Sequence, residues 1–383
     1  MLPPPTVRSR PYRVNHSALA REYLHSDYQL TVFSTGKGGA AICLRYGTPN
    51  GHHIVVYDGG TVTTGNDIVD HIVTRYDTKT VDHLVCSHPC ANLAAGLWPI
   101  LERLEVRQLW MHRPWLHSRA LRQIFSSRRC QDSEFAKHIE DKIAVTFALE
   151  ETALERDVNI AEPFQGEQIG PFIVMSPHRD WYIHRLLQDF ENPPLRKRHF
   201  SPELVRIMRM AGVWKEDEAL NQPDSWENET LTESGETTAE MESSVVLHGL
   251  VGGQGILLTG NAGIKSLSNA AAFAEHVHIP VPSRLRFLQV PCQGNPDHLS
   301  PSVLDRLVGA GHATPPSDKD LTAYVATPYG SREIPHLAVV NALQRRGANV
   351  FHAAGRLSSS YLYSAKSGLI RTHTLPQRQV SHD

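Results

Sequence analysis

A short segment in the first third of the chain constrains the fold most strongly. Residues 82–97 read DHLVCSHPCANLAAGL, in which the apolar run 83–86 has the length and composition of a buried strand. The run ends at Ser87, His88 and Pro89, and an alanine- and leucine-rich segment typical of a helix follows. A strand that delivers polar side chains at its carboxyl end, directly before a helix, is where α/β proteins place their functional groups. The segment therefore predicts an α/β fold with a candidate site beginning at His88.

Apolar patterns on both sides of this segment predict a sheet covered by helices. Apolar runs predict strands over 29–34, 40–46, 53–57 and 107–111, and apolar residues at helical spacing predict helices over 66–76 and 97–104. Farther along, the sequence predicts strands over 172–175, 324–327 and 349–352 and helices over 299–307 and 337–345, the first with Ser300 as N-cap. Strands that alternate with helices are typical of βαβ units.

Composition narrows the class of protein. The chain has 383 residues and a formal net charge of −2, which gives no electrostatic signal for nucleic-acid binding. Its five cysteines have no regular spacing, as expected in a reducing compartment. No apolar run approaches the roughly 18 residues of a membrane span, and the N-terminus lacks the pattern of a signal peptide. These features predict a soluble cytoplasmic protein without a membrane contact.

The segment after the predicted strand resembles the signature of the metallo-β-lactamase fold, His-x-His-x-Asp-His followed by a helix of small residues. His88 matches the first histidine of that signature, and Cys90 stands at the second. Asn92 replaces the aspartate, and Leu93 replaces the last histidine. Upstream, Asp58 ends a predicted strand and matches the Asp-Gly element of the family, where we expect it to accept hydrogen bonds from neighbouring loops.

Two motifs in the second half extend the resemblance, nearest to the metallo-β-lactamase-like domain of DNA-uptake competence proteins. Residues 242–247 resemble the Asn-Ser-Ser-Leu-Val-Leu strand of that group, and residues 255–263 resemble its Leu-Leu-Thr-Gly-Asp-Ala element. Asn261 takes the place of the aspartate that bridges two metals in the family. Cys292 and Gln293 take the places of two histidines in its Lys-Val-Pro-His-His-Gly-Ser motif.

The resemblance implies a fold and its boundaries. The expected fold is an αββα sandwich of two mixed β-sheets flanked by helices, formed by residues 28–356. An irregular leader precedes it at 1–27, and a C-terminal tail follows at 357–383. An insertion is expected at about 192–241, because residues 216–241 are rich in polar residues and too poor in aliphatic ones to offset their ordering entropy.

The replacements bear on the metals that the family uses. A catalytic zinc pair needs several strong ligands for each ion and a bridging carboxylate. Asparagine keeps the shape of aspartate but removes its charge, leucine offers no lone pair, and glutamine is a neutral ligand. The sequence therefore predicts a vestigial pocket without an ordinary dinuclear site, formed by Asp58, His88, Cys90, Asn92, Leu93, Asn261, Cys292 and Gln293.

Two functional hypotheses follow from this pocket. The first is a pseudoenzyme without a cofactor, which acts as a scaffold, sensor or regulatory subunit of a multi-protein, bacterial assembly and contacts a larger protein partner through residues 192–241. The alternative is a metal-dependent hydrolase, a phosphoesterase or nuclease as the resemblance implies, with a remodelled site. It would hold one Zn²⁺ through His88, Cys90 and Cys292, because two thiolates and an imidazole are good zinc ligands.

Overall fold

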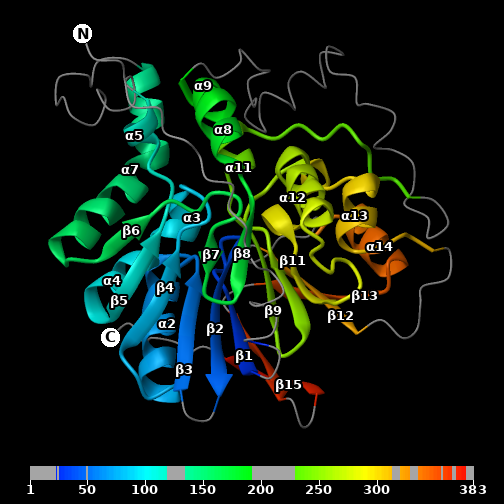
Figure 1. Ribbon diagram of the computed structural model, residues 1–383, viewed down its shortest axis with the longest axis horizontal. Helices are drawn as coiled ribbons and strands as arrows, with labels where there is room; N and C mark the ends of the chain where they lie inside the picture. The colour runs from blue at the N-terminus through cyan, green and yellow to red at the C-terminus, as the bar shows by residue number, and fades with distance from the viewer. Residues whose placement is uncertain are drawn as a thin grey trace, which may run out of the picture.

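Two β-sheets face each other at the centre of the molecule and carry helices on their outer faces (Figure 1). The computed structural model describes residues 23, 26–48, 51–118, 134–191, 229–312, 320–327, 335–354, 357–364 and 368–376. Most of the predicted leader therefore lies outside the described residues. None of the helices in the described ranges combines the length and apolar character needed to cross a bilayer.

The first sheet has the strand order β15-β14-β1-β2-β3-β4-β5-β6. Its strands are β1 (Asp27–Ser34), β2 (Ala40–Thr48), β3 (Gly51–Tyr57), β4 (Thr80–Val85), β5 (Glu105–Trp110), β6 (Asn159–Ala161), β14 (Leu357–Ser364) and β15 (Gly368–Pro376). Neighbours from β15 to β3 run antiparallel, and those from β3 to β6 run parallel. Because parallel strands need crossover connections, helices follow β3 and β4.

The second sheet has the order β13-β12-β11-β10-β9-β8-β7. Its strands are β7 (Gln168–Ile169), β8 (Phe172–Ser176), β9 (Val246–Val251), β10 (Gln254–Leu258), β11 (Leu285–Gln289), β12 (Leu321–Thr327) and β13 (Ala348–Ala354). Neighbours from β7 to β10 are antiparallel, and those from β10 to β13 are parallel. Both sheets are therefore mixed, as predicted.

Helices cover both outer faces of the sandwich, and others lie at the edge between these two faces (Figure 1). Those of the first half are α2 (Val62–Arg75), α3 (Ala91–Ala94), α4 (Leu97–Arg103), α5 (Pro114–His117), α7 (Glu134–Glu155), α8 (Arg179–Trp181), the π-helix η1 (Tyr182–Leu186) and α9 (Leu187–Glu191). Those of the second half are α11 (Ala239–Glu242), α12 (Ile264–His276), η3 (Pro291–Gly294), η4 (Pro296–His298), α13 (Pro301–Leu307) and α14 (Leu337–Arg345).

Three buried apolar layers separate these four layers of structure. The central layer joins the two sheets, for example through Leu30 of β1 and Ile256 of β10. A second layer lies between the first sheet and helices α2, α4 and α7, and a third lies between the second sheet and helices α12, α13 and α14. Burying each large aliphatic side chain stabilises the fold by roughly 2 kcal/mol. The predicted αββα sandwich is confirmed.

Most predicted elements are present, with ends that differ for local reasons. Helix α2 begins four residues earlier than predicted, because the Thr61 side chain accepts a hydrogen bond from the Thr64 backbone N–H and caps it. Ser300 caps α13 as predicted. The predicted strand over 242–247 begins only at Val246, since residues 239–242 form α11.

The segment predicted as a C-terminal tail contains two strands of the first sheet. Strand β14 pairs antiparallel with β1, from Tyr28↔Tyr363 to Phe33↔Ser358, and β15 pairs with β14. Without β14, one edge of β1 would present backbone N–H and C=O groups without partners. The sheet thus extends beyond the predicted domain boundary at 356, and residues 365–367 and 377–383 of the tail lie outside the described residues.

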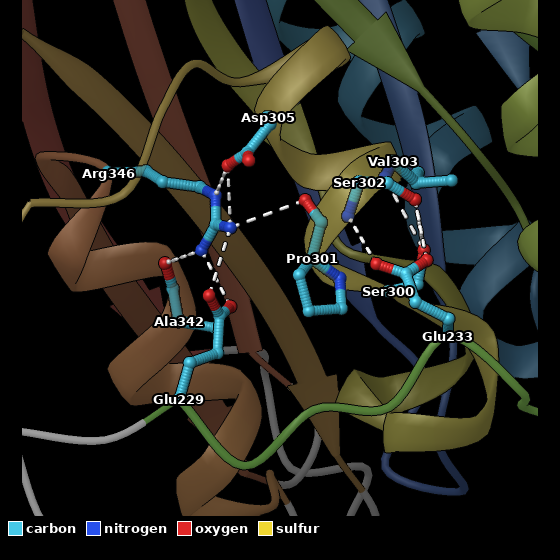
Figure 2. Close-up of polar contacts among 9 residues, drawn as sticks. All are labelled: Glu229, Glu233, Ser300, Pro301, Ser302, Val303, Asp305, Ala342 and Arg346. Atoms are coloured by element: carbon cyan, nitrogen blue, oxygen red, sulfur yellow. Dashed lines mark hydrogen bonds and ion pairs between the residues drawn. The ribbon is translucent and has the colours of Figure 1, made fainter.

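The second part of the predicted insertion is also part of the domain. Residues 192–228 lie outside the described residues, whereas residues 229–238, which we name the strap, cross helices α13 and α14 (Figure 2). Both carboxylate oxygens of Glu229 accept from the Arg346 guanidinium, at 2.8 and 3.2 Å. Arg346 is buried and also donates to Asp305.

Two further contacts hold the strap. Glu233 accepts from the Ser302 backbone N–H at 3.0 Å and from its hydroxyl at 2.5 Å, at the first turn of α13 (Figure 2). Leu231 is 7 % exposed and belongs to the core layer under the helices. The expectation that residues 216–241 bury too little to be ordered is wrong for the strap, because charged hydrogen bonds replace the missing aliphatic contacts.

Candidate functional site

The candidate site lies where strands β3, β4, β10 and β11 end. Asp58 follows β3 and bonds to Ser87, which follows β4. From the second sheet, Asn261 follows β10, and the Cys292 backbone N–H donates to the Gly260 carbonyl at 3.3 Å. The Val245 backbone N–H, directly before β9, donates to the Ser87 carbonyl at 3.0 Å, so the ends of both sheets meet at one edge of the sandwich.

Asp58 links the ends of two parallel strands. Its carboxylate is fully buried and accepts from the Ser87 backbone N–H at 2.8 Å and from the Ser87 hydroxyl at 2.6 Å. Burial raises the pKa of Asp58 to about 7, although both bonds from Ser87 lower it. With φ at 61°, Asp58 adopts the left-handed conformation that aspartate tolerates better than most residues. The side chain is engaged in holding the loops.

His88 is buried and turned toward its own loop. Its Nδ1 accepts from the Cys90 backbone N–H at 3.1 Å, so the neutral ring carries its proton on Nε2. The side chain lines a cavity together with Cys86, His112 and Tyr182. The only motif histidine at the end of β4 that survives unchanged therefore faces the space between the first sheet and its helices.

The other motif positions lie elsewhere. Leu93, Asn261 and Gln293 line a separate small cavity beside Gln289 and Tyr324, and Asn92 is exposed. His88 does not line this cavity. The predicted pocket of eight residues is therefore divided, because the loop after β4 directs His88 to one side and Leu93 to the other.

Two of the replaced residues fill the space above the glycine loop between β1 and β2. A Cβ atom on Gly39 would lie 2.8 Å from the Leu93 Cδ2, and one on Gly38 would overlap the Gln293 amide. Both glycines have positive φ, at 79° for Gly38 and 113° for Gly39. Leucine and glutamine are thus packed against backbone that has room for no side chain of its own.

The two cysteines at motif positions are protonated at neutral pH. Burial and the nearby Asp58 charge raise the pKa of Cys90 to about 12, and burial raises that of Cys292 to about 11. Asn261 Nδ2 lies 3.9 Å from the Cys90 sulfur. Zinc binds the thiolate, so a zinc ion at this place would have to displace both thiol protons.

The donor set as a whole does not fit the metals of the family. In the described ranges, no three His, Cys, Asp or Glu side chains are grouped so that they would hold a metal ion. The predicted convergence of His88, Cys90 and Cys292 on one zinc ion is therefore not found. The physical reason is the orientation of His88, whose Nδ1 is engaged by the Cys90 backbone N–H and which lines a different cavity from Asn261 and Gln293.

Two polar residues of this region, Glu242 and His112, are not among the site residues predicted from the sequence. Glu242 is 2 % exposed and caps α12 by accepting from the Ser266 backbone N–H at 2.7 Å and its hydroxyl at 2.8 Å. Its place in the 242–247 motif was the available signal. His112 lies beside His88 in the same cavity, and its signal was its position directly after a predicted strand.

Comparisons with known proteins give a faint likeness. No protein-family model and no curated protein matches the chain. Among solved structures, the chain is similar to a metallo-β-lactamase of Cronobacter sakazakii described by its HARLDQ motif, with 11 % identity over 64 % of this chain and 71 % of that one and a TM-score of 0.30. For the motif mutant of that protein the identity is 11 %, the coverage 64 % and 69 %, and the TM-score 0.27. Likeness at this level carries no inference about activity.

Proposed function

We propose that this chain is a catalytically inactive protein of the metallo-β-lactamase fold that acts as a scaffold, sensor or regulatory subunit of a larger protein assembly. The observation that carries the proposal is the position of Leu93. At the place of a metal-binding histidine, it is 2 % exposed and packs against Gly39. The backbone N–H groups of Gly59 and Gly60 both donate to its carbonyl oxygen. Leu93 thus serves the packing of the loops.

Electrostatics support the same conclusion. A zinc pair would bring up to four positive charges, and carboxylates are the groups that offset such charge at low dielectric. Asn92 and Asn261 are neutral, and Asp58 is committed to Ser87. The described residues of this edge therefore offer little negative charge to two divalent cations.

One observation favours the alternative of a single-zinc hydrolase. Cys90 and Cys292 are close enough that a charge on Cys292 would raise the pKa of Cys90, and Asn261 contacts the Cys90 sulfur. A zinc ion that displaced both thiol protons would gain two good ligands. This alternative requires His88 to give up the bond from the Cys90 N–H, because zinc would take the lone pair of Nδ1, or would take that of Nε2 and leave the proton on Nδ1.

Metal analysis of the purified chain, combined with hydrolysis of a nitrophenyl phosphodiester in added zinc or manganese, tests the proposal. We expect no stoichiometric metal and no hydrolysis above buffer. About one tightly held zinc ion per chain, lost in the Cys90→Ala/Cys292→Ala variant, would establish the alternative and overturn the proposal.

The partner contact is proposed for the part of the insertion that precedes Glu229, since the strap already binds its own domain. Deletion of residues 196–226 is expected to leave the unfolding temperature unchanged. It should also prevent binding of the partner, so that the complex isolated from its natural source has a smaller mass in light scattering. Deletion of the strap, residues 229–238, is the comparison and should lower stability. An unchanged complex mass after the first deletion would contradict a partner contact there.

A further inference from the structure

The cavity that His88 lines has a volume of about 20 Å³ and lies outside the group of motif residues around Leu93. It is enclosed by the loop after β4, the loop after β5, helix α7 and the π-helix η1. A cavity of about 10–15 Å³ already accommodates one water molecule. This one therefore has room for a water molecule.

His112 is the unusual side chain of this cavity. Both of its ring nitrogens are buried, and neither has a hydrogen-bond partner among the described residues. The ring stacks on Tyr182, with centroids 4.4 Å apart and planes at 23°, and packs against Phe164 at 4.9 Å. Stacking fixes the plane of the ring, and both nitrogens form hydrogen bonds in that plane.

The protonation state of His112 defines what it needs. Burial lowers its pKa to about 4, so the ring is neutral at pH 7 and offers one N–H donor and one acceptor nitrogen. Buried polar groups of this kind nearly always have a partner, and leaving one without a partner costs about 1–3 kcal/mol.

The hydroxyl groups of the cavity wall present acceptors. Thr146 donates its proton to the Ile143 carbonyl at 2.8 Å, and Ser243 donates to the Glu240 carbonyl at 2.6 Å. Their remaining lone pairs are available to a molecule in the cavity. No Lys or Arg lines the wall, which disfavours an anion. The occupant must both donate and accept, and it must be small.

We propose that this cavity is a binding site for one water molecule, which hydrogen-bonds to His112 and to the hydroxyl groups of the wall. The water would tie the loop after β5 to helix α7 and α11, which supply Thr146 and Ser243. It would do so independently of any metal.

A crystal structure of the full chain at a resolution that shows ordered water tests this inference, together with the variant His112→Phe. We expect a peak within hydrogen-bonding distance of a His112 nitrogen in the unmodified protein and no peak there in the variant. An empty cavity in the unmodified protein, a peak that remains in the variant, or an anomalous signal identifying a metal would each overturn it.

His248 supplies the matched control. It is 3 % exposed, and its Nε2 is buried without a partner among the described residues, but it lines neither of the two cavities described above. We expect no water peak at His248. A water peak at His248 as strong as the one at His112 would show that water binding does not depend on the cavity, and would contradict the proposal. If the His112→Phe variant fails to fold, the unmodified structure alone decides.

Discussion

At the scale of single residues, local contacts decide which motif positions keep a chemical role. His88 keeps the residue type of its motif, but its Nδ1 is engaged by the Cys90 backbone N–H. Asp58 also keeps its type, and its two oxygens are engaged by Ser87. Each of these two retained side chains therefore holds the loops of the candidate site in place.

The thiols of Cys90 and Cys292 should react slowly with an alkylating agent. Their pKa values of about 12 and 11 leave few thiolates at pH 8, and the thiolate is the reactive form. We expect modification by iodoacetamide, followed by mass spectrometry, to be much slower than that of free glutathione and to accelerate up to pH 10. The variants Cys90→Ser and Cys292→Ser, which each lack one thiol, show which rate of modification belongs to which cysteine. A plateau of the rate near pH 8 would contradict this account.

Asp58 should make stability fall as the pH rises. Its folded-state pKa of about 7 exceeds the ordinary 3.8, so between these values the folded state binds more protons than the unfolded state. This group's contribution to stability is complete below pH 4 and is lost as the pH rises through 7. We expect the free energy of unfolding, measured with urea at pH 5 and pH 7.5, to fall more between these pH values in the unmodified protein than in Asp58→Asn. Equal falls in both proteins would rule out a raised pKa.

At the scale of elements, the strap and the glycine loop show how polar and small residues complete the packing. Arg346 of the loop after α14 holds Glu229 and Asp305 from two other elements, and its side chain is 1 % exposed. The glycine loop lies directly on Leu93 and Gln293. Neither arrangement has an apolar signature that periodicity would reveal.

Glu229→Ala should destabilise the protein by about 1–3 kcal/mol in urea unfolding, because it leaves the buried Arg346 with fewer charged partners. The matched control is Glu275→Ala, which removes an exposed pair with Arg306 and should change stability little. Equal effects of the two substitutions would mean that the strap contributes no more than an ordinary surface pair.

Gly39→Ala should destabilise the protein by about 1–3 kcal/mol, through its positive φ and the contact with Leu93. Leu93→Ala alone should also destabilise, by about 2–4 kcal/mol, since it opens a cavity. In the double variant the contact is removed, so the total loss should be smaller than the two single losses added together. Strict additivity in a double-mutant cycle would contradict the packing described here.

At the scale of the whole molecule, apolar patterns predicted many of the strands and helices, and the resemblance predicted their arrangement as a sandwich, but neither predicted the edge strands of the first sheet. Strand β8 and helix α14 follow from runs such as FIVM and LAVVNAL, whereas β14 reads LSSSYLYS and carries little apolar signal. Its place in the sheet depends on pairing with β1, which no local pattern encodes. The division of the candidate site likewise depends on how one loop turns, since His88 and Leu93 line different cavities although they are only five residues apart.

The central claim is that this edge of the sandwich does not hold a metal pair. Diffraction from crystals soaked in zinc, recorded above and below the zinc absorption edge, measures this directly. The account predicts no pair of anomalous peaks near His88, Cys90 and Asn261. Two strong peaks about 3.5–4 Å apart beside these residues would contradict it.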